Sequence, residues 1–421
     1  MRFLHAADVH LDSPMLGLAR YGDAAPIDQI RGGTRRAFER LVDLALAEEV
    51  SFVVVAGDLY DGERDDFQTA IFLQRQLHRL SEAGVPVVLA WGNHDAANQI
   101  TKRLSLPPKV HLLPAEEAGT VVLEEAAAAC HGRSYPRRDV LDDLAATYPA
   151  PIGGLLDVGV LHTALDGRPG HDRYAPTSIE ALARRGYGYW ALGHVHTAER
   201  HELDGAQIVF PGNLCGRHIG ESGAKGACLV SYEGETVTSV VHRDLAPLRW
   251  ERVEPDLSRA SSLDQVLADT TQALVRLQES IGSDELVCAR VVLHLEASLA
   301  GSFLADDQRC EAQLRVDASG SGGRVFLERV DVRPLTRPDS EELDEAMSEV
   351  RAAFAHLGSA EGAAELAEIV ENVLGPLRRR FGKDALDQLR MLGVTTLDTG
   401  GLADLLGEAE ALLAAELAKG R

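Results

Sequence analysis

Short apolar runs alternate with helical patterns along the first 245 residues of the chain. Residues 2–7, 51–56 and 85–91 are rich in Val, Leu and Phe, which is typical of buried strands. Between them, residues 27–48 and 65–83 carry apolar side chains at helical spacing. Because strands and helices alternate in this order, we expect right-handed crossovers and a mostly parallel sheet core.

Later apolar runs in the same region are shorter and are separated by turn residues, so we expect an antiparallel portion to join the sheet. Residues 125–130 are ambiguous, because their alanines favour a helix while their position favours a strand. The further predicted strands cover residues 155–161, 187–192, 207–210, 226–232 and 236–242.

The pattern changes after residue 245. Apolar periodicity predicts a helix at 262–281, a strand at 286–295, a second helix at 302–314 and a strand at 324–332. These elements indicate a small α/β domain over residues 246–338, followed by a wholly helical region at 339–421.

Length, charge and cysteine content limit the classes of protein to which the chain can belong. The chain has 421 residues, which exceeds what one hydrophobic core usually supports, and its net charge of −23 argues against a broad basic surface for nucleic acid. No apolar stretch reaches about 18 residues, and no signal peptide is evident at the N-terminus. Five widely spaced cysteines without a CxxC pair favour reduced, buried thiols, so we expect a cytoplasmic protein without a membrane span.

Polar residues that bind metals follow five of the predicted strands. Carboxyl ends of strands gather at one edge of an α/β sheet, so we expect these side chains to meet. Two divalent ions need a bridging carboxylate, imidazoles and neutral oxygen donors, which this set supplies, and a preceding glycine lets the chain turn tightly beside them. A single DxH or HxH is common by chance, whereas the ordered set predicts a binuclear phosphoesterase site. The segments are Asp8-Val9-His10, Gly57-Asp58-Leu59-Tyr60-Asp61, Gly92-Asn93-His94-Asp95, His162-Thr163 and Gly193-His194-Val195-His196.

This ordered set resembles the calcineurin-like metallophosphoesterases, and within them the bacterial DNA-repair exonuclease group that includes the SbcD and YhaO-like proteins. A further run, from Phe210 to His218 and then Lys225-Gly226, is similar to the YhaO-like proteins in particular. The resemblance covers the first 245 residues, and the later segments match in layout only. It implies an α/β metallophosphoesterase β-sandwich flanked by helices, a small capping domain and a helical C-terminal region.

The resemblance also implies roles for the matching residues. His94 lies off the metals and assists the departing oxygen, while Asp95 orients ligands. Asp61 stands where the archaeal and eukaryotic double-strand-break nucleases have a histidine, as in the bacterial relatives, and it joins Arg217 and His218 as a candidate near the substrate. One ion takes Asp8, His10, Asp58 and His196, and the other takes Asp58, Asn93, His162 and His194, with Asp58 bridging.

A ligand set without thiolate suits Mn²⁺, Fe or Zn²⁺, and the resemblance favours two Mn²⁺ ions. It implies a DNA exonuclease or endonuclease subunit that works in repair with an SMC-like ATPase and forms a homodimer through its catalytic domain. The alternative is a small-molecule phosphodiesterase or phosphatase on the same centre. A scaffold with an idle centre is disfavoured, because it has no physical need for so complete a ligand set.

Arginines near the predicted site leave two interpretations open. One group begins the first long helix, and the other lies in a loop that borders the site. Each group either contacts a phosphate backbone or is solvated surface charge. These residues are Arg31, Arg35, Arg36, Arg133, Arg137 and Arg138.

Overall fold

The computed structural model describes residues 1–15, 27–61, 67–97, 105–165, 174–282, 284–320 and 323–335. The predicted helical region at 339–421 lies outside these residues. The chain divides into two compact units. Among the described residues, the first unit holds those within 1–14, 28–217 and 223–249, and the second holds 15, 27, 218–222 and those within 250–335.

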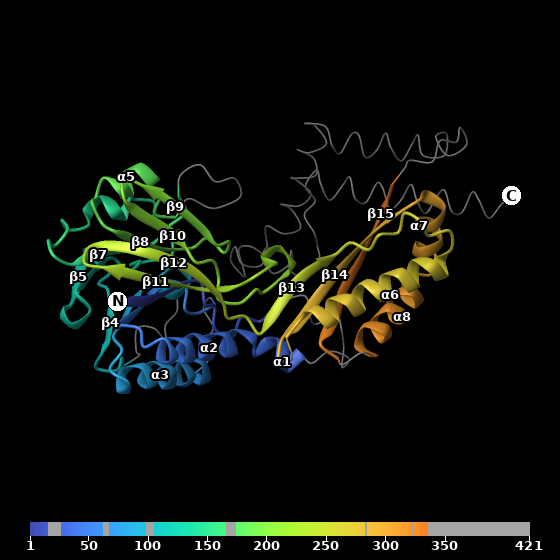
Figure 1. Ribbon diagram of the computed structural model, residues 1–421, viewed down its shortest axis with the longest axis horizontal. Helices are drawn as coiled ribbons and strands as arrows, with labels where there is room; N and C mark the ends of the chain where they lie inside the picture. Colours follow the sequence, from blue (N-terminus) through green and yellow to red (C-terminus); the bar gives the residue numbers. More distant parts are fainter. Residues whose placement is uncertain are drawn as a thin grey trace, which may run out of the picture. The chain divides into compact units, whose positions relative to one another are not determined.

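The first unit is built from two six-stranded sheets packed face to face (Figure 1). The order of the first sheet is β12-β11-β1-β2-β3-β4. Strands β1 to β4 are parallel, whereas β11 is antiparallel to β1 and β12 is antiparallel to β11. Its members are β1 (Arg2–Ala6), β2 (Phe52–Ala56), β3 (Val87–Ala90), β4 (Val110–Leu112), β11 (Gly226–Glu233) and β12 (Thr236–Asp244).

The second sheet has the order β5-β6-β7-β8-β10-β9. Strands β6, β7, β8 and β10 run parallel, and β5 and β9 are antiparallel at the edges. Phe3 and Val54 of the first sheet lie in one buried cluster with Val158 and Ala191 of the second, so the core lies between the sheets. The strands are β5 (Gly119–Leu123), β6 (Ala128–Gly132), β7 (Leu156–His162), β8 (Tyr189–Gly193), β9 (Glu199–Leu203) and β10 (Ala206–Phe210).

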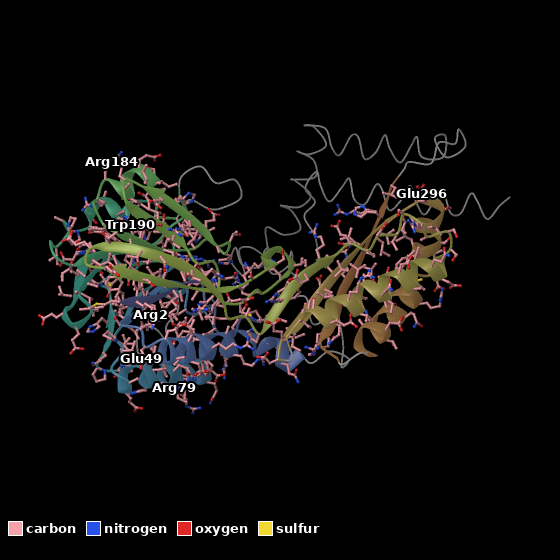
Figure 2. All side chains as sticks on the ribbon, viewed as in Figure 1. Arg2, Glu49, Arg79, Arg184, Trp190 and Glu296 are labelled. Atoms are coloured by element: carbon pink, nitrogen blue, oxygen red, sulfur yellow. The ribbon has the colours of Figure 1, made fainter. Side chains whose placement is uncertain are left out.

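Helices cover the outer faces of this sandwich. Helix α2 buries a stripe that includes Ala37, Leu41 and Ala45. Helices α2 and α3 lie against the first sheet and α5 against the second (Figure 1). Trp190 is fully buried, whereas Arg184 is exposed at the surface (Figure 2). The helices are α1 (Ile27–Arg31), α2 (Gly33–Ala47), α3 (Phe67–Glu82), α4 (Asn93–Ala97) and α5 (Ile179–Ala183).

The described residues of the second unit form the sheet β13-β14-β15 and three helices. Strands β14 and β15 are parallel. Leu274 and Leu314 from the helices pack with Val291 in one core, and the hydroxyl of Ser262 caps α6 by accepting from the backbone N–H of Gln265. The elements are β13 (Leu248–Val253), α6 (Leu263–Ser280), β14 (Leu286–Leu295), α7 (Ala297–Leu304), α8 (Asp307–Gly320) and β15 (Val325–Pro334).

Two predicted helices are wrong in extent. The helix expected at 27–48 divides at Gly32 into α1 and α2, and the helix expected at 302–314 is replaced by α7 and α8. The second half of the ambiguous segment at 125–130 belongs to strand β6, which begins at Ala128, and the first half lies in and after the short 3-10 helix Glu124–Ala126. The antiparallel portion is confirmed as β11 and β12.

Two further expectations concern the cysteines and the possibility of a membrane-spanning helix. All five cysteines are buried free thiols, as expected. Among the helices that the structure describes, none has the length and apolar character needed to cross a bilayer.

Candidate metal centre

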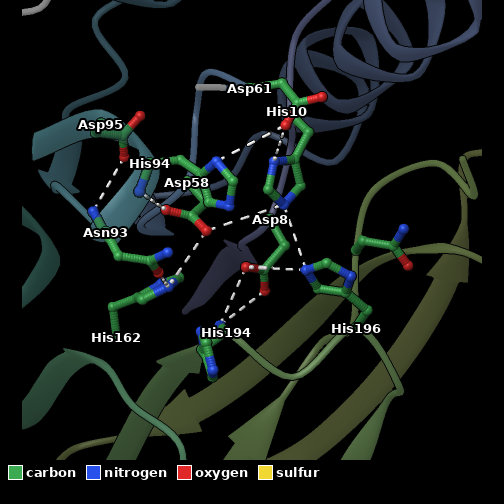
Figure 3. A network of polar contacts seen from close by, with 12 residues as sticks. Asp8, His10, Asp58, Asp61, Asn93, His94, Asp95, His162, His194 and His196 are labelled. Atoms are coloured by element: carbon green, nitrogen blue, oxygen red, sulfur yellow. Dashed lines mark hydrogen bonds and ion pairs between the residues drawn. The ribbon is translucent and has the colours of Figure 1, made fainter. Parts of the chain in front are cut away.

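The predicted site residues lie at the ends of strands from both sheets. Asp8 follows β1, Asp58 follows β2 and Asn93 opens α4 after β3. His162 is the last residue of β7, and His194 comes directly after β8. Figure 3 shows how these side chains converge, with the carboxylate of Asp58 between rings that come from several loops.

Three overlapping groups of ligand-type side chains have their ligand atoms within 4.8 Å of one another in the described part of the chain. Asp58 belongs to two of these groups, as do Asp8 and His10. Such overlap is expected where two ions share ligands. The groups are Asp8, His10 and His196; His10, Asp58 and His94; and Asp8, Asp58 and His162.

The environment of His162 tests whether the cluster fits a cation. Its Nδ1 lies 3.0 Å from the carbonyl oxygen of Ala56, so Nδ1 carries the proton and donates it there. Its Nε2 faces Asn93 Oδ1 at 3.0 Å and Asp58 Oδ2 at 3.4 Å. Burial opposes a charge on this ring, but Asp58 outweighs burial and raises the pKa of His162 to about 9. The position between the ring and the two oxygens therefore favours a positive charge, either a proton on Nε2 or a metal ion bound by the same donors.

A second convergence surrounds His10. Its Nε2 lies 3.3 Å from Nε2 of His196 and 3.9 Å from Asp58 Oδ2. The same nitrogen of His196 lies 3.7 Å from Asp8 Oδ1. Burial, together with the positive charge of Arg217, lowers the pKa of His10 to about 3, so its ring is neutral, which is the form that binds metals.

The two central carboxylates have different surroundings. Burial raises the pKa of Asp8, although both of its oxygens accept from the backbone N–H of His194, at 3.1 and 2.9 Å. Burial opposes ionisation of Asp58 as well, but the rings of His162 and His94 hold the pKa of this residue well below its usual range. One oxygen of Asp58 faces both His10 and His162, which is the geometry that a shared ligand needs.

Backbone conformation at the site is unusual for residues other than glycine. Asp8, His10, Asp58 and His194 have φ values of 49°, 45°, 53° and 95°. A left-handed conformation of this kind costs a non-glycine residue about 1–3 kcal/mol and is concentrated at functional sites. The strand ends therefore hold these four side chains in directions that ordinary backbone would not allow.

The glycines that precede the ligands act mainly by leaving room, and the expectation of tight turns holds only for Gly57, whose φ is +93°. A Cβ on Gly92 would lie 2.3 Å from Asp58 Oδ1. A Cβ on Gly193 would lie 2.0 Å from the carbonyl oxygen of Ala56. Side chains at these positions would therefore push apart the loops that carry the ligands.

The structure places His94 and His194 differently within the cluster. The ring of His94 is partly exposed and lies 5.0 Å from the ring of His10. His194 is in none of the three groups, although its ring packs edge-on against His162 and Tyr174, at 5.2 Å from each.

Two of the remaining candidates, Asp95 and His218, each accept hydrogen bonds from backbone N–H groups. Asp95 is buried and accepts from the backbone N–H groups of Gly92 and Tyr60, both at 3.0 Å, so it joins two ligand-bearing loops. Burial and the charge of Asp58 raise the pKa of Asp95 to about 7. His218 belongs to the second compact unit, where its Nδ1 accepts from the backbone N–H of Gly220.

Asp61 and Arg217 lie at the edge of the cluster. Asp61 Oδ1 is 3.5 Å from His10 Nδ1, 3.8 Å from His94 Nδ1 and 3.5 Å from Arg217 Nη1. Burial raises the pKa of Asp61, but its contact with His10 and the charge of Arg217 outweigh this and hold it below the usual range. This carboxylate is therefore ionised and surrounded by nitrogen groups.

Sequence reasoning missed residues that hold the ligand loops in place. Tyr135 donates its hydroxyl to the carbonyl oxygen of His162 at 2.8 Å, and no spacing in the sequence points to it. The backbone N–H of Asn213 lies 3.3 Å from the carbonyl oxygen of His196, and that of Leu214 lies 3.3 Å from the carbonyl oxygen of Asp8. Both belong to the YhaO-like run, so that resemblance was the available signal.

Several candidate arginines are engaged with the protein itself. Arg35 donates from Nε to Asp12 at 2.6 Å, and its guanidinium group lies over the ring of Phe72. Its side chain is therefore held by the protein and is not simply a solvated charge on the helix surface. Arg133 donates to the carbonyl oxygen of Ala115 at 2.8 Å. Arg35 and Arg133 are therefore held by contacts within the protein.

Comparisons with known proteins agree with this geometry. Residues 1–198 match the calcineurin-like phosphoesterase family, and residues 250–334 match the middle domain of the metallophosphoesterase YhaO. YhaO of Bacillus subtilis is 32% identical over 297 residues, which cover 70% of this chain and 71% of that protein. The DNA double-strand break repair protein Mre11 of Methanopyrus kandleri is 26% identical, over 51% of this chain and 48% of its own length.

A dimetal phosphatase from Danio rerio covers 58% of this chain and 99% of its own, with 14% identity and a TM-score of 0.35. The match to YhaO extends over most of both proteins, and the family match includes all five ligand-bearing strand ends. The chain therefore belongs to the calcineurin-like phosphoesterases and is a metallophosphoesterase related to YhaO, with Mre11 proteins among its more distant relatives.

Proposed function

We propose that this chain is a two-metal phosphodiesterase that cleaves DNA as the nuclease subunit of a repair complex with an SMC-like ATPase. The observation that carries the chemistry is the set of nitrogen and oxygen atoms that converge around Asp58. The choice of DNA is supported by the Mre11 relatives, whose names describe repair of double-strand breaks. The proposed ions are two Mn²⁺.

Two bound ions would activate water and neutralise the phosphoryl oxygens. Among the protein's own residues, Asp58 faces both His10 and His162 and would hold the two ions at a fixed separation. His94 is positioned through its backbone N–H, which donates to Asp58 Oδ1 at 3.0 Å. Its Nδ1 faces Asp61, so Nε2 is the nitrogen that would carry a proton to the departing oxygen.

A small-molecule phosphodiesterase or phosphatase is the second candidate. Its supporting observation is charge, because the chain carries −23 and its arginines Arg35 and Arg133 are bound within the protein. A small ester needs only the metal centre, whereas duplex DNA usually meets a basic face.

One experiment separates these candidates. Metal-loaded protein is incubated with labelled single-stranded and double-stranded DNA, with and without Mn²⁺, beside bis(p-nitrophenyl) phosphate. The proposal expects Mn²⁺-dependent cleavage of DNA and of the small ester, both lost in Asp58→Asn and both retained in Asp43→Asn, an exposed carboxylate of α2. Turnover of the small ester alone would reject the nuclease function. Stimulation of cleavage by ATP with the ATPase present would test the partner.

A further inference from the structure

One buried tyrosine joins the two loops that carry Asn93 and His162. Tyr135 is 2% exposed and lies after β6, outside both of those loops. Its hydroxyl donates to the carbonyl oxygen of His162 at 2.8 Å. Its backbone N–H donates at 2.9 Å to the carbonyl oxygen of Trp91, the first residue after β3. Since β3 belongs to the first sheet and β7 to the second, Tyr135 connects a ligand loop of one sheet to a ligand loop of the other.

The neighbouring Ser134 adds to the connection with the first sheet. Its hydroxyl accepts from the backbone N–H of Trp91 at 3.0 Å and donates to the carbonyl oxygen of Leu113 at 2.6 Å. Trp91 is therefore held through both its N–H and its C=O, by Ser134 and Tyr135. Only one residue separates Trp91 from Asn93, so these bonds also limit where Asn93 can lie.

The ring of His162 is enclosed by fixed groups. It packs edge-on against the ring of Tyr135, with the centroids 5.6 Å apart and the planes at 90°. Its Nδ1 lies 3.0 Å from the carbonyl oxygen of Ala56, and a Cβ on Gly92 would lie 2.9 Å from its Cε1. Its Nε2 is thereby directed at Asn93 Oδ1, 3.0 Å away (Figure 3). The distance between these two ligand atoms therefore depends on the contacts that Tyr135 makes with both loops.

His196, on the other side of the cluster, has different supports. Its carbonyl oxygen accepts from Nζ of Lys225 at 2.7 Å, and the backbone N–H of Asn213 lies 3.3 Å from the same oxygen. These groups come from the chain after β10, whereas Tyr135 comes from the chain after β6. A change at Tyr135 should therefore disturb His162 and leave His196 in place.

We propose that Tyr135 is a positioning residue that sets the affinity of one of the two metal ions, the ion bound by Asn93 and His162. This inference rests on the proposed function, through its centre of two ions. Tyr135 holds the backbone of both loops, so the two ligands face each other before an ion arrives. Ligands that are already ordered bind more tightly, because less free energy is spent on ordering them when the ion binds. The ion on the side of His196 does not depend on this connection.

Titration of Mn²⁺ by calorimetry into the full-length wild type, Tyr135→Phe and Tyr148→Phe tests the inference. Tyr148 is the matched control, because it is also buried and donates its hydroxyl to another carbonyl oxygen of β7, that of Val160, at 2.7 Å. Tyr135→Phe should weaken one Mn²⁺ ion about tenfold to hundredfold, which is the usual effect of removing a group that orients a ligand. Its other ion should bind as in the wild type, and Tyr148→Phe should bind both ions as the wild type does.

Double variants identify the ion that is affected. In a His196→Ala background, the ion that still binds should weaken when Tyr135→Phe is added. In a His162→Ala background, the ion that still binds should not respond to Tyr135→Phe, because the ligand that Tyr135 positions is already gone. If Tyr135→Phe does not fold, Ser134→Ala decides in its place, since it loosens Trp91 and should weaken the same ion.

A loss confined to the ion of Asn93 and His162 is the signature of this role. Equal weakening of both ions, or the same loss in Tyr148→Phe, would mean that the hydroxyl of Tyr135 only supports the fold. Unchanged binding of both ions would mean that its bond to His162 positions nothing, and each of these results overturns the inference. If the selective loss appears, yet the wild type cleaves neither DNA nor bis(p-nitrophenyl) phosphate, the inference stands and the proposed function fails. A wild type that binds no Mn²⁺ overturns both.

Discussion

At the scale of single residues, Asp58 has the central position in the cluster. Its Oδ2 lies 3.4 Å from His162 Nε2 and 3.9 Å from His10 Nε2, and its Oδ1 accepts from the backbone N–H of His94 at 3.0 Å. Asp58→Asn keeps the shape and the Oδ1 contact but removes the charge. We expect Mn²⁺ affinity to fall by more than about 100-fold, beyond the usual effect of changing a group that only supports a ligand. Metal content after dialysis measures this, and stoichiometric Mn²⁺ retained by Asp58→Asn would contradict a shared ligand.

His5 offers a residue-scale prediction that is independent of the metals. It is fully buried, with Nδ1 3.0 Å from the hydroxyl of Tyr189, and burial lowers its pKa from 6.5 to about 3. Below pH 6.5 the unfolded chain takes up a proton at this residue that the folded chain does not, so stability falls as pH decreases towards 3. The slope from one such group is about 1.4 kcal/mol per pH unit.

We therefore expect His5→Gln to make the loss of stability between pH 6 and pH 4 shallower by about 1.4 kcal/mol per pH unit. Urea unfolding of the apo protein at several pH values measures the slope. His78→Gln changes an exposed histidine of α3 and should leave the slope as in the wild type. Equal slopes for wild type and His5→Gln would show that His5 takes up its proton in the folded state.

At the scale of elements, the loop after β8 illustrates how closely the two sheets meet. Gly193 ends β8, and a Cβ there would lie 2.0 Å from the carbonyl oxygen of Ala56 in β2 and 2.9 Å from Nδ1 of His162. Gly193→Ala should destabilise the apo protein by about 1–3 kcal/mol or more, because backbone must move to relieve the overlap. It should also weaken Mn²⁺ binding, because the hydrogen bond between His162 and Ala56 is disturbed.

Gly153→Ala is the matched control for this prediction, because nothing lies within 4 Å of the added Cβ and its backbone is not left-handed. Its unfolding midpoint and metal affinity should stay close to those of the wild type. A Gly193→Ala protein with unchanged stability would mean that the sheets separate easily at this point.

The central strands could be predicted from sequence because burial on both faces leaves continuous apolar runs. The segment at 51–56 became β2 almost without change. The edge strand β9 (Glu199–Leu203) was missed, because its Glu-Arg-His-Glu-Leu sequence has no apolar run and it forms through pairing with β10. The division into two sheets was expected only from the family resemblance, which implied a β-sandwich; the apolar pattern alone does not give it, since strand order is set by packing between distant segments.

The candidate site was predictable for a related reason. Ligands that follow strand ends have local signatures, so Asp8, Asp58, Asn93 and His162 could be named from sequence and do converge in the structure. The contact of Arg217 with Asp61 joins residues 156 positions apart, and no local pattern records it. Groups that support ligands depend on tertiary contacts, and sequence reasoning reached them only through the YhaO-like run.

At the scale of the whole molecule, charge and chemistry impose opposite demands on a protein proposed to bind DNA. A net charge of −23 repels the phosphate backbone, whereas the proposed metal centre and the nearby cation Arg217 would attract a phosphate group locally. Binding by this chain alone should therefore involve few phosphate contacts and should require the ions. Proteins that read DNA through a basic face instead release many counterions and lose affinity steeply with salt.

The expected result is a shallow dependence of DNA affinity on salt. With a phosphorothioate oligonucleotide, which slows cleavage, and Mn²⁺ present, the plot of log K against log salt should have a slope of about −1 to −2. Removal of Mn²⁺ with a chelator should abolish binding, and Arg217→Gln should reduce the slope by about 1, because one cation beside the cluster is removed. Fluorescence anisotropy measures these quantities, with Arg79→Gln, whose arginine pairs with Asp43 on the outer helices, as control. A slope near −6 that persists without metal would place DNA on a basic surface away from the metal cluster, and the centre would then not be the main site of attachment.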